Sequence, residues 1–490
     1  MDKSVDKKNL LFYPVGTIGR DMVYCLITNF LLTYILFTKQ LNGAQLAAIT
    51  AIMAGARVFD ALNDPIMGNI IERTRGKYGK FKPWLVIGIL STGFVVAAIF
   101  NSRLSGWSFI IFFGIFYILF SITYTMHDIS YWGMVPALSS DANLRNQLTS
   151  RATLMAGIGG TLASMLIPIL TAGEHAIASG AAASYGIVSV IVCILAPVFL
   201  AFTIFGVKER RDTEVKPAEP FSFRKIVQTI ARNDQLVWIS VIFLIQQVGN
   251  GIVIGGLGAT YIYFAYGYRG GLYSLFSTIG VSATAFLMIF YPAISRKMHR
   301  KKLMNVLAVV AMAGYAAMVL SVFLSGSMAG FWILTVGYTL SAFGQYGYYL
   351  VMMISIINTV EYNEYRFGTR DEAIITSLRP FLTKMSSAII VILTTVSYAL
   401  FKATSFMNGI SGLEQEAELG TITETEKLSS IDSLLSGVTS GQSLGLLLCM
   451  TILPCALLLL SNLLYQKHYK LDEEEYERIC KELSDRHSKE

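Results

Sequence analysis

Long apolar stretches separated by short polar segments dominate the 490-residue chain. The stretches are continuous and lack the strict alternation of barrel strands, so they predict membrane-spanning helices. We expect twelve spans. They lie at 11–37, 47–71, 83–101, 107–137, 152–172, 181–206, 235–265, 271–294, 303–325, 330–358, 372–401 and 441–466.

The composition agrees with this pattern. Hydrophobic residues make up 54% of the chain and charged residues only 14%, against about 25% in soluble domains. This excludes a disordered chain, a fibrous protein and an ordinary soluble enzyme. The polar N-terminus, MDKSVDKKNL, is not expected to be a cleavable signal peptide. Five cysteines without a CxxC motif predict neither a disulfide scaffold nor a metal site.

The distribution of basic residues predicts the orientation. Of the 39 Lys and Arg residues, 30 fall in the termini and alternate loops, five in the remaining loops and four within spans. Because basic residues concentrate on the cytoplasmic side, both termini are expected there, as an even number of spans requires. The net charge of +7 therefore needs no nucleic-acid partner to explain it.

Residues 207–232 form the longest basic segment and divide the chain into bundles 1–206 and 233–466, followed by a cytoplasmic tail, 467–490. Basic loops recur at matching places in the two bundles. This is the plan of an all-α polytopic protein with the major facilitator fold, whose substrate site lies between the halves near mid-membrane. Segment 404–440, rich in Ser, Thr, Glu and Gly, is expected to be a solvated external loop, and the tail a short surface helix.

Eight ionisable residues fall inside the predicted spans, where each costs about 2.5–3.5 kcal/mol on insertion scales. Such residues usually mark an ion or substrate path, although buried ion pairs that only fix packing are the alternative. The acids are Asp21, Asp60, Asp64 and Asp128, and the bases are Arg20, Arg57, Arg379 and Lys384.

The second span carries a pair of acids. Asp60 and Asp64 are four residues apart on one helical face, with Asn63 beside them. Two ionised carboxylates repel, so either one is protonated or a cation lies between them. Pro65 frees a backbone carbonyl one turn earlier. These hard oxygens suit an alkali ion, unless Arg57, three residues before Asp60, simply neutralises it.

The fourth span carries a stripe suited to a sugar. Tyr124, Asp128 and Trp132 repeat every four residues, so hydroxyls can bind the acid while the sugar face packs on the indole. An aromatic packing stripe around a buried acid is the alternative. The neighbouring His127 is either a satisfied buried histidine or a proton relay. Lys384 in the eleventh span needs an anion, and the acidic pair of the second span is the expected partner.

No P-loop, HExxH or GxSxG motif occurs, so neither an ATP-driven pump nor a hydrolase is expected. Instead, four segments resemble the glycoside–pentoside–hexuronide cation symporters, the melibiose-permease branch of the major facilitator superfamily. The resemblance covers nearly the whole chain. The segments are GTIGRDMVYC, ARVFDALNDPIMGNIIERTRGKYGKFKPW, TYTMHDISYWGMVPALSSD and VEYNEYRFGTRDEAI.

This resemblance implies roles for particular residues. Lys384 matches the family's coupling lysine. The implied cation site consists of Asp60, Asn63, Asp64 and Thr125. The implied substrate contacts are Asp21, Tyr124, Asp128, Trp132 and Arg151, together with Arg20 in place of the usual lysine. Two departures change the pocket: Tyr349 stands where melibiose carriers have tryptophan, and Arg379-Pro380 where they have Gln-Thr.

The resemblance thus implies a multi-pass cell-membrane symporter that moves a sugar or glycoside with Na⁺, Li⁺ or H⁺. No enzyme activity, cofactor, nucleic acid or obligatory protein partner is expected. Arg379 suggests an acidic glycoside such as a hexuronide, unless it pairs with Asp21 or Asp128. Vertebrate lysophospholipid carriers share this ancestry, so a sodium-coupled carrier of a lipid-like or other non-sugar solute is the alternative.

Overall fold

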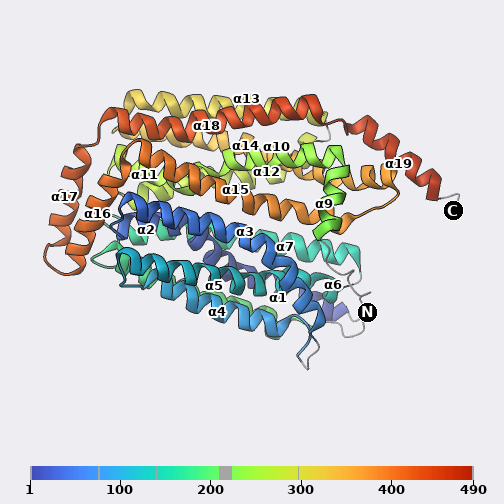
Figure 1. The fold of residues 1–490 in the computed structure, drawn as a ribbon, viewed down its shortest axis with the longest axis horizontal. Coiled ribbons are helices and arrows are strands. Elements are labelled where there is room, and N and C mark those ends of the chain that lie inside the picture. Colours follow the sequence, from blue (N-terminus) through green and yellow to red (C-terminus); the bar gives the residue numbers. More distant parts are fainter. Residues whose placement is uncertain (1–2, 75–77, 140, 209–222, 296, 488–490) are drawn as a thin grey trace. The chain divides into compact units, whose positions relative to one another are not determined.

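The computed structural model describes residues 3–74, 78–139, 141–208, 223–295 and 297–487, and the regular structure of these residues is helical (Figure 1). The first half of the chain forms α1 (Lys3–Cys25), the π-helix η1 (Leu26–Phe30), α2 (Leu31–Thr38), α3 (Gly43–Arg73), α4 (Lys82–Phe100), α5 (Gly106–Gly133), α6 (Val135–Leu138), α7 (Ala142–Thr171) and α8 (Ala181–Gly206). The second half forms α9 (Phe223–Arg232), α10 (Asp234–Gly251), the π-helix η2 (Val253–Leu257), α11 (Gly258–Tyr266), α12 (Gly270–Ser295), α13 (Arg300–Leu320), the 3₁₀-helix η3 (Ser321–Leu324), α14 (Met328–Phe367), α15 (Glu372–Leu400), α16 (Ala403–Glu418), α17 (Glu424–Ser436), α18 (Ser440–His468) and α19 (Glu473–His487).

The expectation of an all-α membrane protein is confirmed. Within the described residues, ten helices are long and apolar enough to cross a membrane, and α3 adds an eleventh if its two bent parts form one span. These parts, Gly43–Asp60 and Leu62–Arg73, meet at 41°. Pro65 explains the bend, because it removes the hydrogen bond to the carbonyl of residue 61. The predicted span 271–294 coincides with α12, whose side chains are described only in part.

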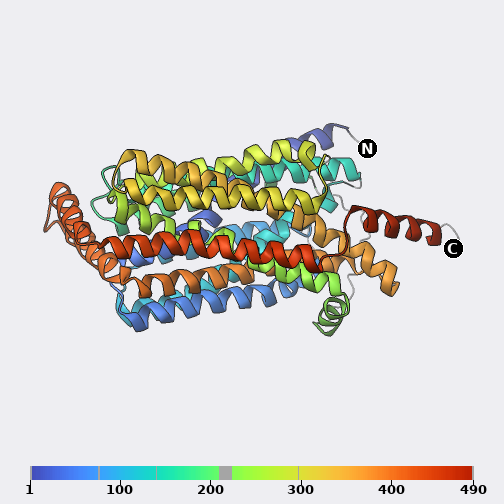
Figure 2. The same ribbon diagram turned by 90° about the horizontal axis from the view of Figure 1, so that it is seen from above.

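The described chain forms two compact units. Unit 1 contains Met1–Glu219, Ile262–Ser277 and Tyr398–Gln442, and unit 2 contains Pro220–Tyr261, Thr278–Ser397 and Ser443–Glu490. The predicted linker, 207–232, lies largely outside the described residues, and its last part forms α9. In unit 2, α14 packs against α13, α10 and α19. Figure 2 shows α18 followed, after a short break, by α19 in dark red.

In unit 1, α1 is held tightly between α7 and α8. A Cβ atom at Gly159 of α7 would lie 2.1 Å from the carbonyl oxygen of Ile18, and one at Gly19 would lie 2.5 Å from the Cα of Ala196 in α8. Small residues at such positions let helix backbones approach closely in a membrane. The helix that carries Arg20 and Asp21 is therefore fixed on two sides.

A π-helical turn interrupts the first span of each predicted bundle. It separates α1 from α2 at Leu26–Phe30, and α10 from α11 at Val253–Leu257. The second turn contains Gly256, whose φ of 126° is open to glycine but strained for other residues. A π-helical turn holds more residues than an α-helical one and often occurs near functional sites.

The expectation of a loop at 404–440 is wrong, because this segment folds into the antiparallel helices α16 and α17. They are seen in orange at the left of Figure 1. The segment contains apolar positions at helical spacing, and Met407, Ile410 and Ile431 are at most 1% exposed. The tail does form the expected helix, α19. Its residues Ile479 and Leu483 are buried, so one face of it packs on protein.

Candidate functional site

The acids of α3 meet hydroxyl groups of α5 within unit 1. Asp60 is 7% exposed, and its Oδ2 lies 3.5 Å from Nη1 of Arg57. Its Oδ1 accepts a hydrogen bond from the hydroxyl of Ser121. Arg57 therefore does neutralise Asp60. The sequence reasoning missed Ser121, although this residue lies one helical turn before Thr125 and so on the same face of α5.

The second acid of α3 contacts Thr125. The Thr125 hydroxyl donates to Oδ1 of Asp64 over 3.1 Å, and Asp64 is half-buried. Asn63 is 9% exposed, and its side-chain nitrogen has no hydrogen-bond partner among the described residues. An unsatisfied buried amide costs about 1–3 kcal/mol, which marks Asn63 as a group that gains from a further partner. The four residues predicted to bind the cation thus lie on two packed helices.

A single guanidinium joins the two acids predicted to bind sugar. Nε and Nη2 of Arg20 donate to Oδ2 of Asp21 over 3.0 and 2.8 Å, and Nη1 donates to Oδ1 of Asp128 over 2.9 Å. The Arg20 side chain is only 5% exposed, whereas that of Asp128 is 36% exposed. The guanidinium carbon also lies 5.1 Å from the centre of the Trp132 ring, in a cation–π contact.

Two tyrosines that bind each other's backbone carbonyl groups fix α1 against α5 near Arg20. The hydroxyl of Tyr13 donates to the carbonyl of Tyr131 over 2.8 Å, and the hydroxyl of Tyr131 donates to the carbonyl of Tyr13. The two rings are stacked with centres 4.5 Å apart. Both side chains are fully buried. This contact holds the helices that carry Arg20 and Asp128 in one register.

The three residues of the predicted stripe lie on one half-buried face of α5. Tyr124, Asp128 and Trp132 all keep part of their surface accessible. The Tyr124 ring is stacked on that of Tyr24, with centres 5.2 Å apart. Tyr24 was not predicted, although it follows Arg20 by four residues and hence shares its helical face. The described site therefore presents two tyrosines, an indole and an acid together.

His127 lies on a different, fully buried face of α5. It is 1% exposed, and a Cβ atom at Gly88 of α4 would lie 2.7 Å from its backbone nitrogen. Its ring meets that of Tyr124 edge to face, at 4.6 Å between centres. The Nε2 atom has no partner among the described residues. The expectation that His127 is a satisfied buried histidine is therefore correct about burial and wrong about its hydrogen bonds.

The remaining predicted residues lie elsewhere. In unit 2, Nη1 of the exposed Arg379 donates to the phenol oxygen of Tyr349 over 3.1 Å and to the sulfur of Met353 over 3.5 Å. Lys384 is half-buried on the same helix, α15, and its pairing with the acids of α3 stays a prediction. In unit 1, the exposed Arg151 donates to the carbonyl of Leu10 over 3.3 Å.

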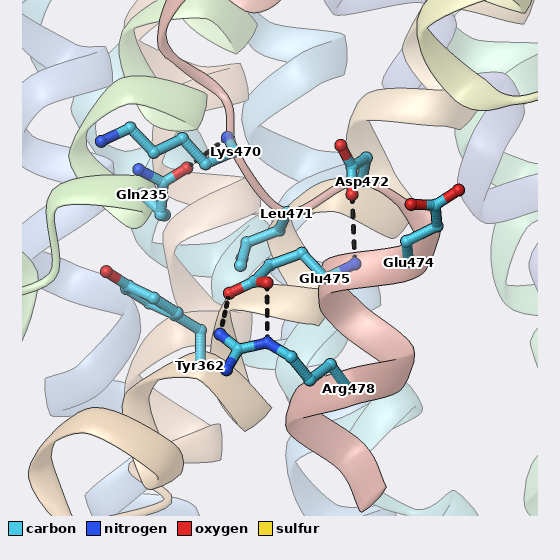
Figure 3. Close-up of a pocket in the computed structure, with 8 residues that line it drawn as sticks. All are labelled: Gln235, Tyr362, Lys470, Leu471, Asp472, Glu474, Glu475 and Arg478. Carbon is cyan, nitrogen blue, oxygen red and sulfur yellow. Dashed lines mark hydrogen bonds and ion pairs between the residues drawn. The ribbon is translucent and has the colours of Figure 1, made fainter.

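One cavity of about 510 Å³ lies in unit 2, between α10, α14 and the start of α19 (Figure 3). Two of its acids have partners in the cavity wall: Arg478 binds Glu475, and the backbone nitrogen of Glu475 donates to Asp472. The backbone nitrogen of Lys470 donates to Gln235. The cavity contains none of the residues predicted to bind cation or substrate. It lies where the tail helix, α19, packs on α14 within unit 2.

Comparison with known proteins gives a consistent result. The raffinose carrier protein of Pediococcus pentosaceus is 26% identical over 487 residues, which cover 96% of this chain and 71% of the carrier. A lactose permease of Leuconostoc lactis is 27% identical over 405 residues, which cover 77% of this chain but 60% of the permease. Both relatives thus extend beyond the aligned region.

Among solved structures, an inward-facing, unoccupied bacterial homologue of the human lysosomal transporter Spinster is similar, with a TM-score of 0.62. The alignment covers 95% of this chain and 98% of that protein at 13% identity, so it speaks for the fold alone. The profile of the family described as MFS/sugar transport protein matches residues 12–473. This chain, a multi-pass membrane transporter and not an enzyme, therefore belongs to the MFS/sugar transport protein family, as a symporter of the glycoside–pentoside–hexuronide type.

Proposed function

We propose that this transporter moves a sugar or glycoside into the cell together with a cation, Na⁺, Li⁺ or H⁺, by alternating access. The names of two relatives, a raffinose carrier and a lactose permease, support a sugar as the substrate class. The proposal includes twelve spans, two cytoplasmic termini and the division into bundles 1–206 and 233–466.

The observation that carries this proposal is that one helix, α5, contacts both groups of acids. Thr125 binds Asp64 of α3, while Asp128, three residues later, binds Arg20 of α1. A shift of α5 that follows cation binding therefore reaches the sugar stripe within one helical turn. If cation binding raises the affinity for sugar by some factor, sugar binding must raise the affinity for the cation by the same factor, because the coupling of binding free energies is reciprocal.

The proposed cation site combines Asp60, Asn63, Asp64 and Thr125. Their carboxylate, amide and hydroxyl oxygens suit Na⁺ or Li⁺, and protonation of one carboxylate would serve the same purpose. Since Arg57 already compensates the charge of Asp60, we assign the exchangeable cation chiefly to Asp64. In the proposed cycle, Lys384 responds electrostatically to the charge of this site. The loaded carrier then changes between its outward-facing and inward-facing states more readily than a half-loaded one.

The proposed substrate site uses Asp128 and Asp21 as acceptors for sugar hydroxyls. Trp132 and Tyr124 supply flat apolar surfaces for a sugar face, and their half-buried positions fit that role. Arg20 binds both carboxylates through one guanidinium. We include Arg151, Tyr349 and Arg379 as further substrate contacts. Arg379 also motivates an acidic glycoside as the substrate, because its planar guanidinium can bind a carboxylate through two hydrogen bonds.

The test is uptake by purified protein in lipid vesicles. A panel of labelled galactosides, glucosides and glucuronides is offered with an inward gradient of Na⁺, Li⁺ or H⁺, or without one. We expect at least one sugar class to be taken up about tenfold faster with a gradient. Lipid movement without sugar uptake would instead favour the lipid-carrier alternative, and sugar uptake indifferent to every cation would refute coupling.

Asp128→Asn tests the sugar contact in the same assay. A hydrogen bond to a charged group contributes about 1.5–3 kcal/mol, so sugar affinity should fall by roughly 10- to 100-fold. Asp432→Asn makes the same chemical change at an exposed position of α17 and serves as the matched control. Unchanged sugar affinity in Asp128→Asn would remove this residue from the substrate site.

A further inference from the structure

The helices α16 and α17 pack against each other around a buried ion pair. Lys427 and Glu414 form an ion pair of 3.1 Å with side chains only 1% and 3% exposed. The ammonium group uses all three of its donors, because it also binds Glu424 at 2.7 Å and the carbonyl of Ser179 at 3.1 Å. The second helix starts with a capping box between Thr423 and Glu426.

The hairpin is attached to unit 1 through backbone groups. Asn408 of α16 accepts from the backbone nitrogen of Leu41 over 3.0 Å and donates to its carbonyl over 2.8 Å. Gln415 donates to the carbonyl of Thr38, the last residue of α2, over 3.0 Å. Glu414 accepts from the backbone nitrogen of Ala181, the first residue of α8, over 2.8 Å. Two ends of unit 1 helices are therefore bound.

The contact with α8 is close. A Cβ atom at Gly180 would lie 2.9 Å from the Cβ of Glu418 and 3.0 Å from the carbonyl oxygen of Glu414. The backbone of Gly180 is extended, with φ of −132°, so glycine stands there for lack of space and not for its conformation. The hairpin is thus seated on unit 1 at backbone distance.

The connections of the hairpin run in another direction. Residues 401–402 join it to α15 and residues 437–439 join it to α18, and most of both helices belongs to unit 2. One extended residue spans at most about 3.6 Å, so connectors of two and three residues have little slack. Hydrogen bonds also hold these connectors in place. The side chain of Gln442 donates to the carbonyl of Phe401 over 3.1 Å and accepts from the backbone nitrogen of Thr439, while the hydroxyl of Thr439 accepts from the backbone nitrogen of Gln442.

From this geometry we propose that the α16–α17 hairpin is a latch on the side of the membrane opposite the basic loops, which must leave α2 and α8 each time the carrier opens to that side. The inference rests on the proposed alternating access, in which the two halves move relative to each other. A hairpin bound to unit 1 by its surface, and to α15 and α18 by short connectors, cannot stay seated while those helices move away. Its contacts with Leu41, Thr38 and Ala181 then set the free energy of opening.

A disulfide between Gly180→Cys and Glu418→Cys tests the latch, since the two Cβ atoms need to move apart by less than 1 Å to reach the usual 3.5–4.5 Å. We expect the oxidised double variant to take up substrate at least about tenfold more slowly than the same protein after reduction. Gly409→Cys with Leu434→Cys is the matched control. It joins α16 to α17 within the hairpin, where a Cβ atom at Gly409 would lie 3.6 Å from Cγ of Leu434, and should leave uptake unchanged by oxidation.

The outcomes separate the latch from the proposed function. If the oxidised double variant transports at the reduced rate, or if the bridge does not form under oxidant, the latch is refuted. Uptake by the wild type and by the reduced variant continues to support symport in either case. If the wild type transports no sugar at all, the proposed function fails, and the second measurement below still tests the latch.

The second measurement needs no transport and tests whether the hairpin covers Leu41. Leu41 is 5% exposed and keeps its backbone bonds to Asn408 when its side chain is changed. Labelling of Leu41→Cys by a membrane-impermeant maleimide should be slow, and at least about fivefold faster when Asn408→Ala and Gln415→Ala are added. Equal labelling rates with and without these two changes would overturn the proposal.

Discussion

Two clusters of buried charge in unit 1 differ in how completely their polar atoms are used. In the hairpin, Lys427 and Glu414 are almost fully enclosed, and every donor of the ammonium group has an acceptor within unit 1. Between α1 and α5, Arg20 is equally buried, but Asp21 and Asp128 remain 20% and 36% exposed. The Lys427–Glu414 pair is thus enclosed, and only the outer acid of its cluster, Glu424, is 42% exposed, whereas both carboxylates that bind Arg20 keep accessible surface.

The difference shows that a buried ion pair is not by itself the mark of a site. A closed pair holds elements together and gains nothing from a ligand, whereas a pair with an accessible acid can still accept a hydroxyl. Removing one partner leaves an uncompensated buried charge in both cases. The consequences should nevertheless differ, because the closed pair affects the stability and the docking of the hairpin, whereas the open one affects sugar binding.

The largest effect is expected at the acids of α3. Asp64→Asn should reduce cation-driven accumulation to the passive level while the protein still folds, as measured by uptake and by detergent-extracted yield. Asp60→Asn should instead lower the yield, because it strands Arg57, at a cost of about 3–5 kcal/mol. Restoring the yield with Arg57→Gln in the Asp60→Asn background is the control. Wild-type accumulation by Asp64→Asn would show that the cation is bound elsewhere.

Arg20 tests the open cluster directly. Arg20→Gln removes the cation that binds both Asp21 and Asp128, so the two carboxylates are left uncompensated and sugar affinity should fall by about 30-fold, or about 2 kcal/mol after allowance for their exposure. Arg20→Lys keeps the charge but loses the three-point fork, and should retain most of the affinity. Equilibrium binding of labelled sugar measures both. Equal affinities in the two variants would mean that charge at residue 20 does not organise the acids.

Arg379 sharpens the comparison from unit 2, where the guanidinium is exposed and contacts a phenol and a thioether. If the substrate is acidic, Arg379→Gln should weaken competition by glucuronides about tenfold and leave that by matched glucosides unchanged. Tyr349→Phe removes only the phenol hydroxyl and controls for the local packing. Should neutral glucosides compete best in wild type and variant alike, the acidic-substrate hypothesis must be abandoned.

The smallest effect is expected in the closed cluster. Burial raises the pKa of Glu414, and the attraction of Lys427 only partly opposes this. Tyr268 also contacts the carboxyl group, and Glu424 shares the ammonium. A raised pKa in the folded state means that the contribution of Glu414 to stability is full below its unfolded pKa and is lost as pH rises through the folded value.

Wild type should therefore lose stability relative to Glu414→Gln as pH rises above the ordinary pKa of a glutamate, by a few degrees in Tm. Differential scanning fluorimetry at several pH values measures the shift. Sugar affinity should not follow it. A constant difference in Tm across this range, or a parallel change in sugar affinity, would contradict the distinction between the two clusters.

Much of the fold followed from the sequence because lipid imposes a strong and local rule. A run of apolar residues must become a helix, so the helices α1, α4, α5, α8 and α10 appear where the hydropathy places them. The hairpin was missed because its helices are short and amphipathic: polar residues such as Lys427 obscured the helical spacing of apolar positions such as Ile431. Their burial depends on contacts with residues more than 200 positions away.

Part of the arrangement of the candidate residues followed from the sequence for the same reason. Helical spacing places Tyr124, Asp128 and Trp132 on one face whatever the rest of the chain does. It does not say that Arg20 would bind both Asp21 and Asp128, because that contact joins residues 108 positions apart and depends on the packing of α1 against α5. Ser121 and Tyr24 were within reach of sequence reasoning, since each lies four residues from a residue already chosen.

In the first span, the π-helical turn η1 lies between Arg20, the centre of the open cluster, and Thr38, to which the hairpin is bound. Each residue rotates an α-helix by about 100°, and a π-helical turn holds about one residue more than an α-helical turn. The segment before η1, with Arg20, and the segment after it, with Thr38, thus have separate rotational phases. Deleting one residue within Leu26–Phe30 would bring them into a single phase. The guanidinium and the seat of the hairpin could then no longer both face their partners, although neither had been mutated.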